Sequence, residues 1–366
     1  MKQNFLPRYT IGKDAFASIK DIVSPYGNRI ALIYGEKAFS ATKDKLLPYL
    51  NDFEIVHEEI YGKEASYANI DRLKDNPQLE KADVLLAIGG GKCLDVVKTV
   101  SDLLGKPVFT IASIASTCAA VTRIAIIHND DGSFREIYRL KEVPVHCFID
   151  PEIIVNAPSQ YFWAGMGDTM AKHVESVFSS KNDVLDFESR FGIAVSKLCY
   201  EPILEKGEKA YEDVRKHIVS AEVEDVIKSI IIATGTVSVS VNPDYTSALA
   251  HALYYGLTIR EWMERRHLHG EIVSYGTLVQ LLLDRQMDEL KRVYGINDTI
   301  LLLILKIDYY TKDTLIPIVL YEIYNPITKE QLNLSYCEEI FIKLNIPVNI
   351  DKSKLFKYDP NSEYYT

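Results

Sequence analysis

The chain has 366 residues, of which 47% are hydrophobic and 25% charged, so it is long enough to bury two separate cores. Its net charge of −10 disfavours a nucleic-acid partner, because binding to a phosphate backbone requires a concentrated basic patch. No segment resembles a signal peptide or a membrane span, and the five cysteines form no CxxC pair, so we expect a reduced, cytoplasmic protein without a membrane partner.

Short apolar runs alternate with helical stretches over the first 150 residues. Six of these runs are typical of buried strands: 29–34, 53–60, 82–88, 108–111, 124–128 and 145–149. Strands that alternate with helices form parallel βαβ units, so the pattern predicts a doubly wound parallel sheet.

Strand patterns become rare after Pro151, and helical periodicity takes their place. The helices predicted there are 168–179, 186–200, 221–239, 246–257, 273–288 and 337–344. We therefore predict an α/β domain over residues 1–155 and an all-α domain over residues 156–366. The family resemblance given below implies that the first binds a dinucleotide and the second binds metal and substrate. Ligand sites often lie in the cleft between two domains.

Three consecutive glycines, Gly89, Gly90 and Gly91, stand where a predicted strand ends and a helix begins. Glycines there permit a positive φ and a close approach to a ligand, and the helix N-terminus attracts a pyrophosphate. A tight turn that needs glycine for packing is the alternative. Asp95 and Lys98 share one face of the new helix, either as part of a cofactor site or as a solvated surface ion pair.

The decamer GGGKCLDVVK that begins at Gly89 resembles the GGGSxxDxxK cofactor motif of one superfamily. Its members are the glycerol dehydrogenases, the iron-type alcohol dehydrogenases and the dehydroquinate synthases. Lys92 replaces the common Ser, as it does in glycerol dehydrogenases, and the resemblance implies that Lys92 also contacts the cofactor. The loop follows the third predicted strand, which argues against an ordinary Rossmann dehydrogenase, whose fingerprint follows the first.

Glu36 follows the first predicted strand. A carboxylate at this position can accept hydrogen bonds from the ribose hydroxyls of NAD, although an ordinary loop carboxylate is an equal alternative. The adjacent Lys37 could instead tolerate the 2′-phosphate of NADP. NAD is therefore favoured, with NADP left open.

A second loop, residues 111–120, is rich in small and hydroxyl side chains. It resembles the family loop that lies along the ribose and nicotinamide, which makes Ser113, Ser116 and Thr117 candidate cofactor contacts. Glycerol dehydrogenases typically read STDAP here, with an Asp that helps to hold the polyol. This chain reads STCAA, so Cys118 replaces the carboxylate.

The loss of this carboxylate bears on the substrate. A carboxylate accepts hydrogen bonds from hydroxyls but repels an anion, whereas a neutral Cys118 would not repel a carboxylate. The STCAA form resembles the branch of the family that reduces 2-oxo acids, which makes Arg123 a candidate clamp for a substrate carboxylate. A surface or subunit-contact arginine and a small core-filling cysteine are the alternatives.

Three later segments resemble the metal site of glycerol dehydrogenases: GMGD at 165–168, ALAHAL at 248–253 and HGE at 269–271. The ligands implied are Asp168, His251 and His269, separated by 83 and 18 residues as in that family. Eighteen residues along one helix would span roughly 27 Å, so the ligands must converge from different helices. One carboxylate and two imidazoles suit Zn²⁺ or a similar divalent ion and leave a position open for substrate.

Three residues near these motifs need a separate interpretation. His267 would face another way on the helix of His269 and lacks the following Gly-Glu. His173 is expected in the cleft lining or on the surface. Tyr254 replaces a second histidine of the family's HAxHNG pattern and becomes a candidate substrate contact.

The resemblance covers roughly residues 1–285 and implies a metal-dependent NAD(P) oxidoreductase. Asp168, His251 and His269 are then the catalytic residues, since their metal acts as a Lewis acid on the substrate oxygen while hydride passes to the nicotinamide. A polyol or alcohol dehydrogenase is expected first, a 2-oxo acid reductase second and a dehydroquinate synthase-like lyase third. Relatives commonly form homo-oligomers, so we expect one here.

Overall fold

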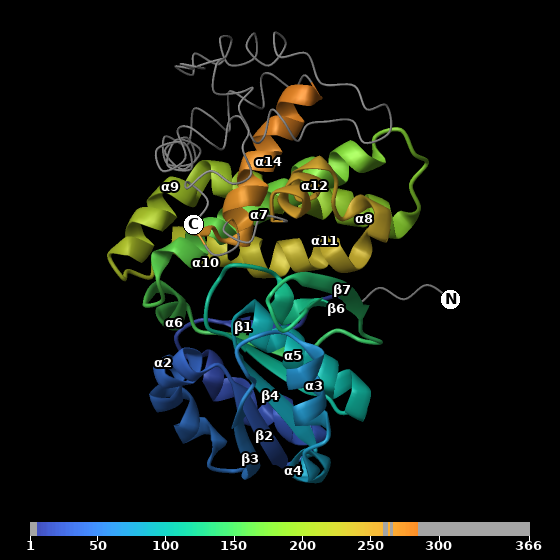
Figure 1. Ribbon diagram of the computed structural model, residues 1–366. Helices are drawn as coiled ribbons and strands as arrows, with labels where there is room; N and C mark the ends of the chain where they lie inside the picture. Colours follow the sequence, from blue (N-terminus) through green and yellow to red (C-terminus); the bar gives the residue numbers. More distant parts are fainter. Residues whose placement is uncertain (1–5, 259–262, 264–265, 285–366) are drawn as a thin grey trace, which may run out of the picture.

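The computed structural model describes residues 6–258, 263 and 266–284, which form an α/β part with a helical part stacked on it (Figure 1). The last strand ends at Ile149, and every described element after it is helical. The fold class expected from the sequence is confirmed. The boundary at residue 155 stays a prediction, and helix 337–344 lies outside the described residues.

One parallel sheet forms the base of the α/β part. Its strands are β1 (Tyr9–Ile11), β2 (Arg29–Tyr34), β3 (Glu54–Ile60), β4 (Val84–Gly89), β5 (Val108–Ala112) and β8 (His146–Ile149). They run in the order β1-β8-β5-β4-β2-β3, and every neighbouring pair is parallel. All residues of the central strand β4 are buried, as expected for a parallel strand covered on both faces. The three-residue strand β1 was not predicted.

Helices cover both faces of the sheet. They are α1 (Ile19–Val23), α2 (Glu36–Leu46), α3 (Tyr67–Lys74), α4 (Pro77–Lys81), α5 (Gly91–Leu104) and α6 (Pro151–Val155). On one face, Leu86 belongs to a core shared with α1 and α2. On the other, Ala87 belongs to a core shared with α3 and α5. Alternate strand residues therefore enter two different cores, which is the doubly wound arrangement.

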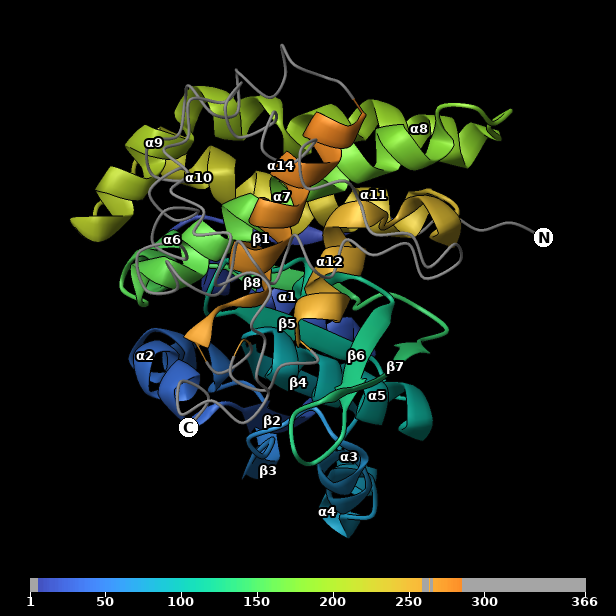
Figure 2. The same cartoon turned by 45° about the horizontal axis from the view of Figure 1, so that its top comes forward.

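The helical part consists, in the described residues, of seven α-helices. They are α7 (Ser159–Ser180), α8 (Phe187–Ser196), α9 (Glu201–Arg215), α10 (Ala221–Lys228), α11 (Thr234–Ser240), α12 (Leu249–Thr258) and α14 (His269–Leu283). The predicted helix 221–239 is continuous but contains a π-helical segment at Ser229–Ala233, and α9 was not predicted. In Figure 2, α14 crosses α7. A Cβ on Gly270 would meet the Ala164 backbone, so glycine permits this crossing.

The prediction for residues 124–128 was right about the strand but wrong about the strand it pairs with. Residues 124–128 do form a strand, β6 (Ile124–His128), but it pairs antiparallel with β7 (Phe134–Arg139) outside the main sheet. Its burial alternates along the strand, as in a hairpin buried on one face. Both views place this hairpin between the sheet and the helical part, and the Phe134 ring lies 5.5 Å from that of Tyr255 on α12.

Within the described part of the chain, no helix combines the length and the apolar character needed to cross a bilayer.

Candidate active site and metal centre

A cleft of about 1730 Å³ lies between the α/β part and the helical part. Its lining comes from the loops after β2, β4 and β5, from the β6–β7 hairpin and from helices α7, α12 and α14. The strand loops belong to the carboxyl edge of the parallel sheet, where ligands of open α/β sheets bind. The cleft therefore combines both sets of motif residues expected from the sequence.

The triple-glycine loop reaches the cleft through Gly90 and Gly91, whereas Gly89 lies behind them as the last residue of β4. None of the three has a positive φ, so the expectation of left-handed backbone was wrong. Space explains the glycines instead. A Cβ on Gly90 would lie 2.6 Å from the side chain of Ile114, so glycine lets the two loops approach each other. Helix α5 begins at Gly91, so its first N–H groups, which have no partner within the helix, belong to the segment that lines the cleft.

Asp95 and Lys98 form a buried ion pair, and the surface-pair alternative is wrong. Their charged atoms are 2.9 Å apart, and Lys98 is fully buried. The Lys98 Nζ donates to the backbone oxygen of Ile124 at 2.6 Å, and Asp95 Oδ2 accepts from the N–H of Ile126 at 3.0 Å. The pair thus ties α5 to β6. Asp95 lines the cleft but Lys98 does not.

A polar cluster at the cleft edge was missed by sequence reasoning. Glu64 accepts hydrogen bonds from Lys92 Nζ at 2.5 Å and from His128 Nδ1 at 2.7 Å. Burial raises the pKa of Glu64, but the bonds from His128 and Lys92 outweigh it and lower the pKa to about 2. Lys92 is thereby held by a carboxylate 28 residues away in the chain, a distance at which no local pattern could reveal the contact.

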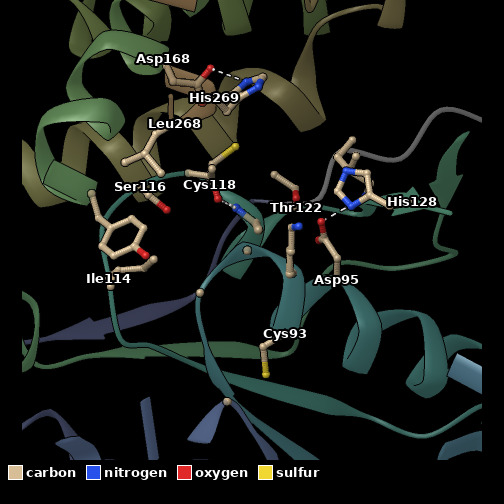
Figure 3. Close-up of a pocket in the computed structure, with 18 of the residues that line it drawn as sticks. Cys93, Asp95, Ile114, Ser116, Cys118, Thr122, His128, Asp168, Leu268 and His269 are labelled. Atoms are coloured by element: carbon tan, nitrogen blue, oxygen red, sulfur yellow. Dashed lines mark hydrogen bonds and ion pairs between the residues drawn. The ribbon is translucent and has the colours of Figure 1, made fainter. Parts of the chain in front are cut away.

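The second loop lines the same cleft with Ser113, Ser116, Thr117 and Cys118. Figure 3 labels Ser116 and Cys118 among these. The Ser113 N–H donates to the Gly89 oxygen at 3.1 Å, which joins the two loops. Cys118 Sγ lies 3.9 Å from the Ser238 hydroxyl, and burial raises the pKa of its thiol. Cys118 is therefore a neutral group in the cleft wall.

Two charged candidates lie at exposed positions of the same cleft. Glu36 is the first residue of α2, and Arg123 directly precedes β6. Both side chains are exposed and line the cleft.

The three predicted metal ligands converge from three helices. Asp168 lies on α7, His251 on α12, and His269 is the first residue of α14. Asp168 Oδ1 is 3.5 Å from His251 Nε2 and 3.3 Å from His269 Nε2, a contact visible in Figure 3. One ligand atom from each residue lies within 4.8 Å of the other two. The side chain of His269 is 35% exposed, compared with 11% for Asp168, so the group opens to the cleft on the His269 side.

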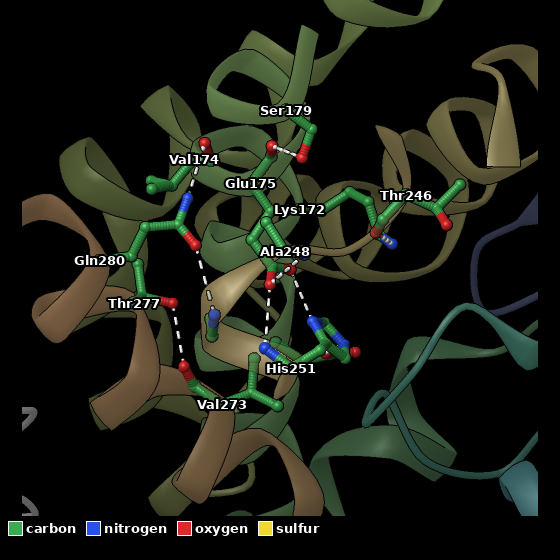
Figure 4. Close-up of polar contacts among 12 residues, drawn as sticks. Lys172, Val174, Glu175, Ser179, Thr246, Ala248, His251, Val273, Thr277 and Gln280 are labelled. Atoms are coloured by element: carbon green, nitrogen blue, oxygen red, sulfur yellow. Dashed lines mark hydrogen bonds and ion pairs between the residues drawn. The ribbon is translucent and has the colours of Figure 1, made fainter. Parts of the chain in front are cut away.

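A fourth side chain, Glu175, fixes the orientation of His251 (Figure 4). Glu175 Oε2 lies 2.5 Å from His251 Nδ1, while Oε1 accepts from the backbone N–H groups of Ala248 at 2.7 Å and His251 at 2.9 Å. The carboxylate thus holds the Nδ1 side of the ring and leaves Nε2 facing Asp168. Metal-binding histidines commonly have such a carboxylate partner.

The electrostatics of this group fit a cation. Burial raises the pKa of Asp168, but the nearby His269 and His251 lower it far below its usual value. Burial lowers the pKa of His251, but Glu175 and Asp168 raise it to about 9. Asp168 Oδ1 is buried without a hydrogen-bond partner. A carboxylate oxygen left in this way, facing two imidazole nitrogens, is a natural ligand set for a divalent ion.

The remaining histidines do not join this group. His267 precedes α14 rather than lying on it, and its Nδ1 is 3.2 Å from Glu271 Oε2. His173 does not line the cleft and is only partly exposed. Its Nδ1 pairs with the Ser196 hydroxyl at 2.7 Å. Tyr254 lines the cleft, and its ring packs edge-on against His269 at 4.3 Å.

Comparisons with known proteins agree on one family. A family model for iron-containing alcohol dehydrogenases matches residues 7–151. The glycerol dehydrogenase of Thermotoga maritima is 31% identical over 296 residues, which cover 80% of each chain. Hydroxycarboxylate dehydrogenase A of Escherichia coli is 35% identical over 213 residues, 58% of this chain and 59% of that protein.

Solved structures share the fold. The crystal structure of the Schizosaccharomyces pombe glycerol dehydrogenase has a TM-score of 0.72 at 23% identity and covers 81% of this chain and 76% of its own. A probable glycerol dehydrogenase from Sinorhizobium meliloti has a TM-score of 0.71 at 22% identity and covers 94% and 98%.

Proposed function

The chain belongs to the iron-containing alcohol dehydrogenase family, and we propose that it is a metal-dependent NAD(P) oxidoreductase of the glycerol dehydrogenase type. The reaction is a reversible hydride transfer between a small polyol or alcohol and its ketone. The convergence of Asp168, His251 and His269 at the open side of the cleft carries this proposal. A bound cation would satisfy the buried Asp168 oxygen that has no hydrogen-bond partner, which supports the proposal.

The ligand set supports Zn²⁺ as the resident ion, with Fe²⁺ as the alternative. When bound, a divalent ion supplies Lewis-acid polarisation of the substrate oxygen. Asp168 and His251 would hold the ion from the buried side of the site, and His269 would hold it from the side that opens to the cleft. Glu175 fixes the His251 ring with Nε2 toward the site.

The cofactor is proposed to lie along the carboxyl edge of the sheet. The pyrophosphate would rest on the N–H groups at Gly90 and Gly91, because helix N-termini bind anions. Ser116 and Thr117 would line the nicotinamide side and place it near His269. Glu36 supports NAD as the preferred cofactor, with NADP as the alternative because of the adjacent Lys37.

A second candidate is a 2-hydroxycarboxylate dehydrogenase on the same scaffold. The neutral Cys118 in the cleft wall favours it, because no carboxylate at that position repels an anionic substrate. Arg123 lines the cleft as a possible outer contact for such an anion. A lyase of the dehydroquinate synthase type has less support.

The test is oxidation of NADH and NADPH by the purified, zinc-supplied protein. Dihydroxyacetone is offered beside 2-oxobutyrate and 2-oxoglutarate. Preference for dihydroxyacetone supports the polyol reaction, and preference for the oxo acids supports the second candidate. Absence of turnover with every substrate and both cofactors would contradict an oxidoreductase.

Assembly and location belong to the same proposal. We place the enzyme in the cytoplasm as a homo-oligomer whose domains meet near residue 155. Light scattering on the purified protein tests the oligomer, because a monomer at micromolar concentration would contradict it. Limited proteolysis tests the boundary.

A further inference from the structure

A buried lysine lies one helical turn beyond Asp168 on α7. Lys172 is 8% exposed and lines the cleft (Figure 4). Its Nζ donates to the backbone oxygen of Thr246 at 2.6 Å. An ammonium group has three N–H donors, so this one bond leaves it capacity for others. Burial of a cation is costly unless charge or hydrogen bonds compensate. The buried Glu175 carboxylate, three residues further along α7, supplies part of that compensation, and the proposed hydride transfer gives Lys172 no role.

The charges around Cys118 favour an anion. Burial is the main cause of the raised pKa of its thiol. Lys172 and Lys98 act to lower that pKa, and Asp168 acts to raise it further. Lys98 is already paired with Asp95, so Lys172 is the cation of this group that lines the cleft, and a divalent ion at Asp168 would offset the charge of that carboxylate. A neutral polyol gains no charge pairing in this environment, whereas a carboxylate does.

We infer that Lys172, with Cys118 and Ser238, forms a subsite for the carboxylate of a small 2-hydroxy acid or 2-oxo acid. The inference rests on the proposed function and names its substrate class. The substrate's hydroxyl or carbonyl oxygen would face Asp168, His251 and His269. Lys172 acts as a specificity residue, and Ser238 offers a hydroxyl donor beside the neutral thiol.

The spacing suits two groups on adjacent carbons. Asp168 and Lys172 are four residues apart on one helix, so both point from the same face about 6 Å apart along its axis. A 2-hydroxy acid carries its hydroxyl and carboxylate on neighbouring carbons, and one small molecule can reach both. Lys172 is also better placed than Arg123, because it is buried beside the metal group whereas Arg123 is exposed.

The experiment compares two substrates of equal carbon skeleton: 2-oxobutyrate and the uncharged 1-hydroxy-2-butanone. With NADH and zinc, the wild type should have the higher kcat/KM for the acid. Lys172→Met should lower kcat/KM for the acid by roughly 10- to 100-fold, the usual loss for a charge-assisted hydrogen bond, mainly through KM. For the neutral ketone the change should be less than about threefold. Lys172→Arg should retain part of the preference.

Two further measurements keep the inference testable if Lys172→Met folds poorly. Cys118→Asp leaves Lys172 in place and should shift the preference toward the neutral ketone by at least tenfold. Binding of oxamate, a 2-oxo acid analogue, to the wild type with NADH should be tight relative to acetamide and should weaken in Cys118→Asp.

The outcomes separate this inference from the proposed function. If the wild type reduces the neutral ketone but not the acid, or if Lys172→Met lowers both equally, the subsite is wrong and Lys172 serves only to anchor Thr246. If the wild type reduces neither compound, hydride transfer itself is contradicted. Oxamate binding still decides the subsite in that case, because it needs no turnover.

Discussion

The motif residues on the cofactor side of the cleft and those on the metal side have different roles. On the cofactor side, Asp95 and Lys98 pair with each other and hold the β6 backbone, and Lys98 does not reach the cleft. On the metal side, Asp168 and His269 themselves point into the cleft. A motif can therefore mark either the groups that touch a ligand or the groups that position the backbone around it. The two cases predict different consequences of substitution.

The largest effect is expected on the metal side. Asp168→Asn removes the anionic ligand while keeping the side-chain volume, and it should lower kcat/KM by about 10³-fold, since Lewis-acid stabilisation is worth several kcal/mol. Steady-state kinetics and metal content, measured together, check this. Asp244→Asn, at an exposed position, is the matched control and should change neither. Full activity of Asp168→Asn would contradict the claim that the motif residues on the metal side contact the ligand directly.

On the cofactor side the effect should fall on stability. Lys98→Met leaves Asp95 buried without its partner and should lower the free energy of unfolding by about 3 kcal/mol, as measured by urea denaturation. The chain offers a matched pair with the same i,i+3 spacing, Asp71 and Lys74, whose side chains are 53% and 34% exposed. Lys74→Met should change stability little. Equal losses in the two variants would show that burial of the Asp95 pair does not matter.

A smaller effect is expected at Glu175, which contacts the candidate ligand His251. Glu175→Gln keeps the shape of the carboxylate but weakens its hold on His251 Nδ1, so zinc affinity should fall by roughly 10- to 100-fold. Competition with a chromophoric chelator measures it. Glu208→Gln, exposed on α9, is the control. Unchanged affinity in Glu175→Gln would mean that His251 is oriented by packing alone.

The smallest effect concerns pH. The folded-state pKa of Glu64 is lowered to about 2, so its contribution to stability is complete above the unfolded-state value near 4.5 and disappears as pH falls through 2. Glu64→Gln should therefore be less stable at pH 7 by on the order of 1 kcal/mol, since partial solvent exposure weakens its bonds. The gap between variant and wild type should close between pH 4.5 and 2 in thermal melts. A gap that stays constant with pH would contradict the role of the charge.

Sequence reasoning predicted the three candidate metal ligands that the structure brings together, but not the side chains that surround them. The buried strands β2 and β4 were predicted from their composition. The candidate ligands came only from the family resemblance, because 83 residues separate Asp168 from His251 and no local pattern joins them. Lys172 and Glu175 were missed although they follow Asp168 at i+4 and i+7. A polar stripe along one face of an otherwise buried helix was the available signal.

Other features of the fold leave no local pattern in the sequence. Residues 124–128 have the composition of a strand, but composition does not specify a partner, so this strand was assigned to the parallel sheet instead of the hairpin with β7. The bond from Lys92 to Glu64 joins helix α5 to the loop after β3, and only the folded chain brings these segments together. Such contacts depend on topology rather than on periodicity.

The most direct test of metal-dependent hydride transfer is reconstitution. The chain is stripped with a chelator, and NADH oxidation in the presence of 2-oxobutyrate or dihydroxyacetone is followed while Zn²⁺ or Fe²⁺ is added back. We expect almost no turnover without metal and a linear rise that saturates at one ion per chain. Full turnover in the stripped protein, or activity that never responds to added metal, would contradict the account.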